Sequence, residues 1–592
     1  MSTTHFDAVI VGSGFGGSVM AYRLARAGFS VCVLERGKSY PPGSFPRSPT
    51  AVKQGFWDPS ERLYGMMNAW SFDGIGALVS SGLGGGSLIY ANVMLRKPAE
   101  WFVREDGEYW PVTRAELDRH YDAVEAVLGG EPYPFAFAPY NRTGKTAAML
   151  EGARSLGLEG FLPRLAITFR GRPDRDPVPG ALIEGSEHNL HGAPRFTCRL
   201  CGECDFGCNL GSKNTLDYNY LSAAQRHGAE IRALSEVKTF ASREGGGFVV
   251  DYVRHHPDGG AAGPGARTPV RLTADRLVLA AGTLGSTFLL LKNRAAFPGL
   301  SPALGTHFSG NGDLLGVATR TRGRDAEGRP REMGTCEAPV ITAGVRVPDA
   351  AEGKGATGRG FYILDAGIPA FMVWLMEYLV PSALPVRLGS MVVRNVIPKA
   401  LPRFLRRLLR RPDPDLSAEI SGVFGDTALS ATTLPLLGLG RDLPNGRLTL
   451  DRRGRLKVDW RIGASRAYFA RLEATMRALV KSWGGTFVAS PSKFLDRLIT
   501  VHPLGGCPMG RTRDEGVVDA YGRVFGCPGL YVADGSVMPG PVGPNPSLTI
   551  AALADRFAEQ LIRDAGRDPD AEQVYLPVEV VGAPAGTVDA LQ

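Results

Sequence analysis

The stretch VIVGSGFGG, residues 9–17, decides the fold of this chain. A short apolar strand runs directly into Gly12-x-Gly14-x-x-Gly17, a helix-like segment follows to residue 27, and a second apolar strand ends at Glu35. In such a βαβ unit the first glycine permits a tight turn, the second lets the backbone approach a pyrophosphate, and the third lets the helix pack close to the strand. The spacing therefore predicts a dinucleotide-binding fold.

Two further features of this unit favour dinucleotide binding. The N-terminus of the helix expected at Ser18–Ala27 directs its N–H groups and its positive dipole end towards the phosphates. Glu35 follows Gly17 by 18 residues, which is about where an acidic residue holds the ribose hydroxyls. The whole fingerprint is present, and not a glycine triplet alone.

Composition sets limits on the class of protein. A chain of 592 residues predicts about two to four domains. The net charge of +8, from 67 basic and 59 acidic residues, is modest for this length, so no nucleic-acid partner is expected. No secretory signal and no apolar run long enough to span a bilayer is visible. We therefore expect a cytoplasmic protein whose eight cysteines are thiols or ligands.

Later segments return to the nucleotide-fold pattern. Residues 277–286, LVLAAGTLGS, predict a buried strand that turns at Gly282 into a helix, and residues 529–535 predict a strand that ends in an acid. The predicted fold class is α/β, a discontinuous Rossmann-type domain with an inserted α+β substrate-binding domain. The expected ranges are 1–330 for the first part of the nucleotide domain with a cysteine-rich insertion near 198–208, 331–495 for the substrate lobe, 496–566 for the return, and 567–592 for a tail.

Further motifs complete a set that spans residues 6–565. They are Gly84-Gly85-Gly86-Ser87 with Asn92, Ala281-Gly282-Thr283, His502, Asp534-Gly535-Ser536 and Pro544-Asn545-Pro546-Ser547. Together with the glycine turn and Glu35, this set resembles the glucose-methanol-choline (GMC) family of FAD-dependent oxidoreductases. Residues 198–221 and the closing NPSLTIAALA resemble its bacterial cholesterol oxidase-like branch. The resemblance covers the fold and the flavin site and does not establish the substrate.

The resemblance implies FAD as the cofactor. The first glycine turn and Glu35 would hold the ADP half, the second glycine-rich segment would lie along the pyrophosphate and the isoalloxazine, and Asp534 would reach the ribityl or pyrophosphate region. The residues implied along the cofactor are Gly12, Gly14, Phe15, Gly16, Gly17, Glu35, Gly85, Ser87, Asn92, Ala281, Gly282, Asp534, Gly535, Asn545 and Pro546.

His502 and Asn545 are the expected catalytic residues. Alcohol oxidation removes a hydride from carbon and a proton from oxygen; a flavin takes the hydride, and the protein must accept the proton. Histidine suits this task because its ordinary pKa lies near working pH. His502 stands where an apolar strand enters a Pro/Gly turn, and Asn545 is held between two prolines and can both donate to and accept from the substrate oxygen.

The cysteine run Cys198-x-x-Cys201-x-x-Cys204-x-x-x-Cys208 has the spacing of bacterial ferredoxin ligands. The last cysteine is followed by asparagine rather than proline, and no second run exists for a second cluster. A remote fourth ligand would be needed, for which Cys507 and Cys527 are candidates. The run fits an iron–sulfur cluster, a structural zinc site or four plain reduced thiols.

One segment of the substrate lobe, within residues 366–411, has the pattern of a membrane-facing surface. Apolar residues recur at helical spacing from Leu401 to Leu409, with arginines on the other face, and residues 366–376 are apolar. This pattern indicates peripheral contact with the inner face of a membrane. A surface helix packed on the substrate lobe fits it equally well.

The leading functional hypothesis is FAD-dependent oxidation of a hydrophobic alcohol, sterol-like or long-chain. A 3β-hydroxysteroid oxidase that also isomerises its product would need a carboxylate base, for which Glu337 and Glu377 are candidates by location. A dehydrogenase would pass electrons through an Fe–S cluster to a carrier protein instead of to oxygen. A flavoprotein of this fold that oxidises no alcohol is the remaining alternative.

Overall fold

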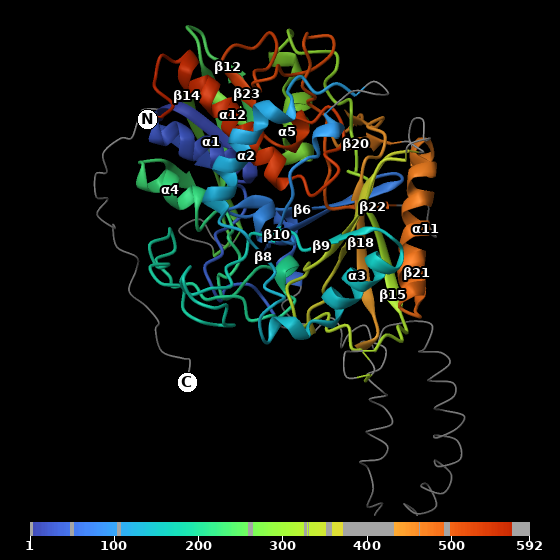
Figure 1. Ribbon diagram of the computed structural model, residues 1–592. Coiled ribbons are helices and arrows are strands. Elements are labelled where there is room, and N and C mark those ends of the chain that lie inside the picture. Colours follow the sequence, from blue (N-terminus) through green and yellow to red (C-terminus); the bar gives the residue numbers. More distant parts are fainter. Residues whose placement is uncertain are drawn as a thin grey trace, which may run out of the picture.

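The computed structural model describes residues 4–47, 53–102, 108–258, 265–324, 328–329, 331–350, 358–370, 431–460, 462–489 and 498–570. Two large sheets organise these residues, and Figure 1 shows them side by side, each with its own helices. Each sheet has a hydrophobic core of its own.

The first sheet is the predicted nucleotide-binding sheet. Its strand order is β11-β2-β1-β14-β13-β12, and β23 also pairs with β14. The pairs β11–β2, β2–β1, β1–β14 and β14–β23 are parallel, and β13 pairs antiparallel with both neighbours. The bounds are β1 Thr4–Val11, β2 Val31–Leu34, β11 Glu230–Arg232, β12 Ser235–Ser242, β13 Phe248–His256, β14 Ala266–Leu279 and β23 Leu530–Val532.

The central strands are apolar because helices cover the sheet. All four residues of β2 are buried, as is the VIV that precedes the first glycine turn. The helices α1 and α12 pack against each other, and α2 packs on α12 (Figure 1). The bounds are α1 Phe15–Arg26, α2 Arg114–Leu128, α4 Tyr220–Arg226, α5 Gly282–Lys292 and α12 Ser547–Asp564. The predicted α/β fold with a Rossmann-type sheet is confirmed, and the pairing of β23 with β14 brings the end of the chain back to that sheet.

The second sheet is antiparallel throughout, in the order β21-β15-β18-β17-β16-β9. Figure 1 shows α11, Arg466–Ser482, lying along β15, β18 and β21. Its buried residues Leu472 and Met476 are one helical turn apart and meet Gly438 of β18, where any side chain would collide with them. The other bounds are α3 Gly144–Ser155, β9 Glu159–Phe161, β15 Leu314–Thr319, β16 Gly344–Val347, β17 Phe361–Asp365, β18 Leu434–Gly440 and β21 Thr486–Ala489.

Smaller sheets accompany the two large ones. Their orders are β22-β6-β5, β7-β10-β8, β19-β20 and β3-β4. The bounds are β3 Trp57–Asp58, β4 Leu63–Tyr64, β5 Met67–Ser71, β6 Ile75–Ser80, β7 Val93–Met94, β8 Glu131–Pro132, β10 Arg164–Leu165, β19 Arg447–Leu450, β20 Leu456–Asp459 and β22 Leu498–Thr500. The pairing of β22 with β6 places the residues before His502 beside the strand that leads into the second glycine-rich segment.

Among the described residues, no helix is both long and apolar enough to cross a membrane. Most of the segment with the membrane-facing pattern, residues 371–411, lies outside the described ranges, and so does Glu377. The division into the predicted ranges stays a prediction; the strands β9 and β15 of the second sheet come before residue 331.

Candidate functional site

The first glycine turn is closed on one side and open on the other. Gly12 has φ +101°, and a Cβ there would lie 2.3 Å from the carbonyl oxygen of Ala280. A Cβ on Gly17 would lie 2.0 Å from the carbonyl oxygen of Gly12, and one on Gly16 would lie 1.6 Å from that of Ala533. A Cβ on Gly14 would meet no atom within 4 Å. Three glycines thus allow close packing of backbones, and Gly14 leaves space where a ligand can approach.

Glu35 lies beside this turn, at the end of β2. One carboxylate oxygen accepts hydrogen bonds from the backbone N–H and the hydroxyl of Ser13, at 3.1 and 2.7 Å. The other accepts from the N–H of Gly37 at 2.8 Å. The carboxylate is buried, and the oxygen that accepts from Gly37 keeps acceptor capacity for a further donor. The geometry suits an acid that fixes the turn and binds ribose hydroxyls.

The second glycine-rich segment touches the first turn. Gly85 opens the short 3₁₀ helix η3, Gly85–Leu88, and a Cβ on it would lie 2.5 Å from the Cα of Gly14. The hydroxyl of Ser87 donates to the carbonyl of Gly84 and accepts from the N–H of Leu216. Asn92 is fully buried at φ +67°, and neither its amide oxygen nor its amide nitrogen has a partner. A strained, buried and unpaired amide indicates a ligand-binding position.

The start of helix α5 forms a third part of the site, after the two glycine-rich segments. Gly282, at φ +77°, donates its N–H to Asp534, whose carboxylate also accepts from the hydroxyls of Ser286 and Ser536. Burial raises the pKa of Asp534 above its ordinary value. Ala281 donates its N–H to the Ser286 hydroxyl. The acid thus joins the start of α5 to the 3₁₀ helix η13, Gly535–Val537.

These pieces fit a bound dinucleotide. The helices α1 and α5 begin directly after the carboxyl ends of the parallel strands β1 and β14, which is where open α/β sheets bind nucleotides. Phe15, at the first turn of α1, packs edge to face on Tyr90 with ring centroids 5.5 Å apart. Gly535 is buried and close to Thr283. The buried, unpaired amide atoms of Asn92 and the amide oxygen of Asn545 are polar groups for which a ligand would supply partners.

His502 is held by an aspartate that sequence reasoning missed. Its Nδ1 lies 2.8 Å from Oδ1 of Asp313, whose side chain is 2% exposed. The other oxygen of Asp313 accepts from the backbone N–H groups of Val501 and His502 and from the hydroxyl of Thr500. Because a carboxylate only accepts hydrogen bonds, neutral His502 carries its proton on Nδ1. Its Nε2 is then a free base.

Asn545 is presented by a loop that the same turn supports. Its side chain is buried, and its Oδ1 has no partner. Asn311 holds the residues just before it: the Asn311 amide donates to the carbonyls of Gly543 and Pro544, and its Oδ1 accepts from the N–H of Gly543. Pro546 then precedes the first turn of α12. The turn of residues 309–313 thus holds His502 through Asp313 and the Asn545 loop through Asn311.

A second buried acid stabilises that turn. Asp442 accepts from the hydroxyl of Ser309 and the N–H of Gly310. Burial raises the pKa of Asp442 to about 7, and the nearby charge of Asp313 adds to the rise. The signal that could have found this turn is the run Ser309-Gly310-Asn311-Gly312-Asp313, directly before the apolar stretch 314–318. It combines turn residues with two side chains able to hydrogen-bond elsewhere.

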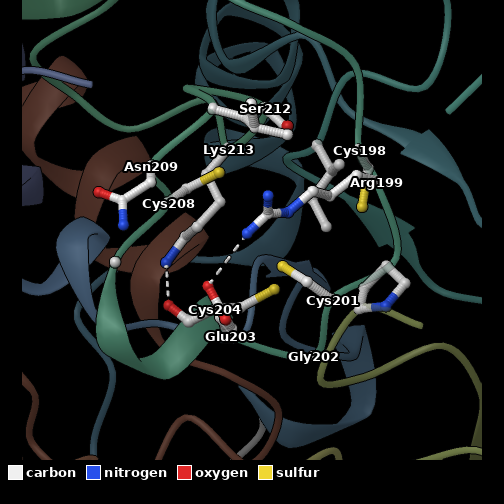
Figure 2. Close-up of a pocket in the computed structure, with 14 residues that line it drawn as sticks. Cys198, Arg199, Cys201, Gly202, Glu203, Cys204, Cys208, Asn209, Ser212 and Lys213 are labelled. Atoms are coloured by element: carbon white, nitrogen blue, oxygen red, sulfur yellow. Dashed lines mark hydrogen bonds and ion pairs between the residues drawn. The ribbon is translucent and has the colours of Figure 1, made fainter. Parts of the chain in front are cut away.

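The four cysteines of the run line one cavity, beside the 3₁₀ helix η6, Cys204–Phe206. Figure 2 shows their side chains approaching the same space from different parts of the loop, together with Arg199 and Lys213. Cys507 and Cys527 are not among its lining residues and belong to the core of the nucleotide sheet. The idea of a remote fourth ligand from these two cysteines is therefore wrong, because Cys208 lines the cavity itself.

A single metal ion does not fit this arrangement. Within the described ranges, no three His, Cys, Asp or Glu side chains converge as a mononuclear site requires. A structural zinc needs four ligands around one point, so the zinc interpretation loses support.

Glu337, a candidate base for isomerisation, is exposed.

Comparisons with known proteins agree with this geometry. The family model described as GMC oxidoreductase matches residues 445–554, and that of an NAD(P)-binding Rossmann-like domain matches residues 10–43. A cholesterol oxidase of Mycobacterium tuberculosis (strain ATCC 25618 / H37Rv) is 30% identical over 571 residues, which cover 93% of this chain and 90% of that protein. A cholesterol oxidase of Acinetobacter baumannii is 26% identical, and the match covers 93% of this chain and 93% of that protein.

A solved structure shows the same fold at lower identity. The formate oxidase of Aspergillus oryzae RIB40 superimposes with a TM-score of 0.57 at 15% identity, covering 96% of this chain and 100% of that one.

Proposed function

The chain belongs to the GMC oxidoreductase family, and on that premise we propose that it binds FAD and oxidises a hydrophobic alcohol, sterol-like or long-chain, with His502 as the base. The observation that carries the proposal is the pairing of His502 with a buried, multiply hydrogen-bonded aspartate, next to a loop that presents Asn545. The names of the two similar cholesterol oxidases support a sterol-like substrate.

FAD would lie across the two glycine-rich segments and the start of α5. The open side of Gly14 and the N-terminus of α1 would face its pyrophosphate, and Glu35 would bind the adenosine ribose. Asn92 and Asn545 would offer their unpaired amide atoms nearer the flavin ring. When bound, the flavin supplies the hydride acceptor for the alcohol carbon.

The protein's own task is to take the hydroxyl proton. The free Nε2 of His502 accepts it, and the imidazolium that forms is stabilised by Asp313 through the existing Nδ1 contact. Asp313 is itself kept in place by two backbone N–H groups and a threonine hydroxyl. The base is therefore oriented before substrate arrives, which lowers the reorganisation that the reaction requires.

Asn545 would orient the alcohol. An amide offers a donor and an acceptor, and this one is held between two prolines on a loop tied down by Asn311. Contacts from both side chains to the hydroxyl oxygen would direct the carbon–hydrogen bond towards the flavin.

The test is an anaerobic stopped-flow screen of flavin reduction with steroid, terpenoid and fatty alcohols. We expect rapid bleaching with at least one apolar alcohol and slow or no bleaching with short polar ones. Uniform failure across the panel would support the alternative of a flavoprotein that oxidises no alcohol. Product analysis in the same samples detects any isomerisation of a steroid product.

The electron acceptor is proposed to be oxygen, as the word oxidase in the names of the relatives suggests. The cysteine cavity favours the second candidate, a dehydrogenase that reduces a carrier protein. Oxygen uptake at the rate of flavin reduction supports the oxidase, and uptake far below that rate supports the dehydrogenase.

Peripheral membrane contact from the cytoplasmic side is part of the same proposal, because an apolar substrate dissolves in bilayers. The support is the sequence pattern of apolar and basic residues at 401–411. Co-sedimentation with anionic liposomes at low salt, reversed at high salt, would agree with it; failure to bind at low salt would contradict it.

A further inference from the structure

The cysteine loop has features that four unreactive thiols do not need. Its four cysteines fall within 11 residues and all line one cavity. The loop reaches this shape through left-handed backbone at Leu200, φ +65°, and at Gly202 and Gly207. Leu200 is not a glycine, so its conformation costs free energy that the surroundings must offset.

Donors are directed at the sulfurs. The N–H of Leu200 lies 3.4 Å from Sγ of Cys198, and the N–H of Val340 donates to Cys204. The N–H of Glu203 and the guanidinium of Arg199 both hydrogen-bond to Cys201. Burial raises the pKa of the Cys198, Cys201 and Cys204 thiols, and these hydrogen bonds oppose that rise. N–H donors to sulfur are also what tunes iron–sulfur clusters.

Positive charge stands beside the same cavity. The side chains of Arg199 and Lys213 both line it. Lys213 is almost fully buried, and its ammonium donates to the carbonyls of Leu88, Tyr90 and Cys204. A cluster held by four thiolates is an anion, and buried anions need such compensation. The same lysine joins the cysteine loop to the segment that leads to Asn92.

The spacing of the thiols separates two kinds of metal site. A single ion would draw four sulfurs to one point, and no such convergence exists among the described side chains. A cubane cluster is different, because each thiolate binds a different iron at a corner of the core, so the sulfurs stand apart around a cavity. The four cysteines line one shared cavity (Figure 2), which is the space that such a cluster would occupy.

We propose that Cys198, Cys201, Cys204 and Cys208 bind a [4Fe–4S] cluster. The ligand set is complete within the loop, with Cys208 as the fourth ligand. Neither the GMC fold nor alcohol oxidation requires this site, so the proposal does not rest on the proposed function.

The test is to express the full chain with iron supplementation, purify it anaerobically and reconstitute it with ferrous iron and sulfide. We expect about four irons and four acid-labile sulfides per chain, broad absorbance beyond the flavin bands, and an electron paramagnetic resonance signal after dithionite reduction. Less than about half an iron per chain, or stoichiometric zinc without sulfide, would overturn the proposal. No substrate is present, so these measurements do not depend on alcohol oxidation.

Variants locate the cluster. Cys201→Ala and Cys208→Ala should each lose most of the sulfide and the resonance signal while they keep bound flavin, which reports that the chain is folded. Cys527→Ala is the control, because this cysteine lies away from the cavity, in the core of the nucleotide sheet. Equal iron in Cys201→Ala and Cys527→Ala would contradict the assignment, and the iron and sulfide content of the unaltered protein decides the question if a variant does not fold.

Discussion

Two of the protein's histidine–aspartate pairs have nearly the same contact and different surroundings. His502 lies 2.8 Å from Asp313, and His120 of α2 lies 2.7 Å from Asp555 of α12. The His502 side chain is 15% exposed, whereas that of His120 is 2% exposed and is enclosed between the two helices. The second nitrogen of His120 lies 3.9 Å from Glu559. A paired carboxylate therefore does not make a histidine a base; access of the other nitrogen to a substrate does.

The largest expected effect comes from removing the imidazole at the site. His502→Ala should slow flavin reduction by its best alcohol about 10³–10⁴-fold, because no group remains to take the proton. Flavin content should stay the same. Stopped-flow reduction under anaerobic conditions measures the effect.

The matched variant His120→Ala should lower stability and leave the rate of flavin reduction nearly unchanged. It removes a buried hydrogen bond between α2 and α12, so the melting temperature should fall by several degrees while flavin reduction stays within about two-fold. A slow His120→Ala enzyme, or a fast His502→Ala enzyme, would break the distinction between the two pairs.

Asp313→Asn is expected to slow flavin reduction about 10²–10³-fold, by analogy with aspartates that fix a histidine tautomer. Three donors face one carboxylate oxygen, so the new amide NH₂ must face Nδ1 of His502. The imidazole then carries its proton on Nε2 and cannot act as the base. Raising the pH should not restore the rate, since deprotonation does not return the proton to Nδ1. Recovery at high pH would argue against the tautomer role, and Asp555→Asn is the control expected to keep the rate.

The two pairs also show what the sequence could and could not predict. The glycine turn, Glu35 and the strand before Gly282 are local patterns, and the fold follows from them. Asp313 lies 189 residues from His502 along the chain, and Asn311 lies 232 residues from Gly543. The local sequence marks a turn here, but it does not show which segments the side chains hold, because that role arises only when distant segments pack together.

The same reasoning applies to the cysteine run. The spacing of the cysteines alone is compatible with a cluster, a zinc site or free thiols. The cavity that the four cysteines share, and the absence of Cys507 and Cys527 from its lining, are consequences of tertiary packing.

Asn311→Gly is expected to slow flavin reduction by about ten-fold, because it frees the loop that presents Asn545. Glycine is chosen since Asn311 has φ +53°, which glycine adopts without strain. The control is Asn189→Gly, because the Asn189 amide also donates to two carbonyls, those of Ser186 and Ala193, outside the site. A loss of equal size in both variants would mean that general destabilisation, and not the position of Asn545, is responsible.

The smallest expected effect is a pH dependence of stability that originates at Asp442. Burial raises the pKa of this carboxyl from 3.8 to about 7. Between these values the folded chain holds a proton that the unfolded chain has released, so the contribution of Asp442 to stability is greatest at low pH and falls as pH rises towards 7.

Asp442→Asn cannot titrate, so the stability of the unaltered protein relative to this variant should fall by about 2 kcal/mol between pH 5 and 7 and change little above pH 8. Urea unfolding at several pH values measures it. Asp451→Asn is the control, because hydrogen bonds from Arg455 lower the pKa of Asp451 and keep it ionised throughout that range. If both variants show the same pH dependence, Asp442 does not keep a raised pKa in the folded chain, and the turn that holds Asp313 does not bind a proton near neutral pH.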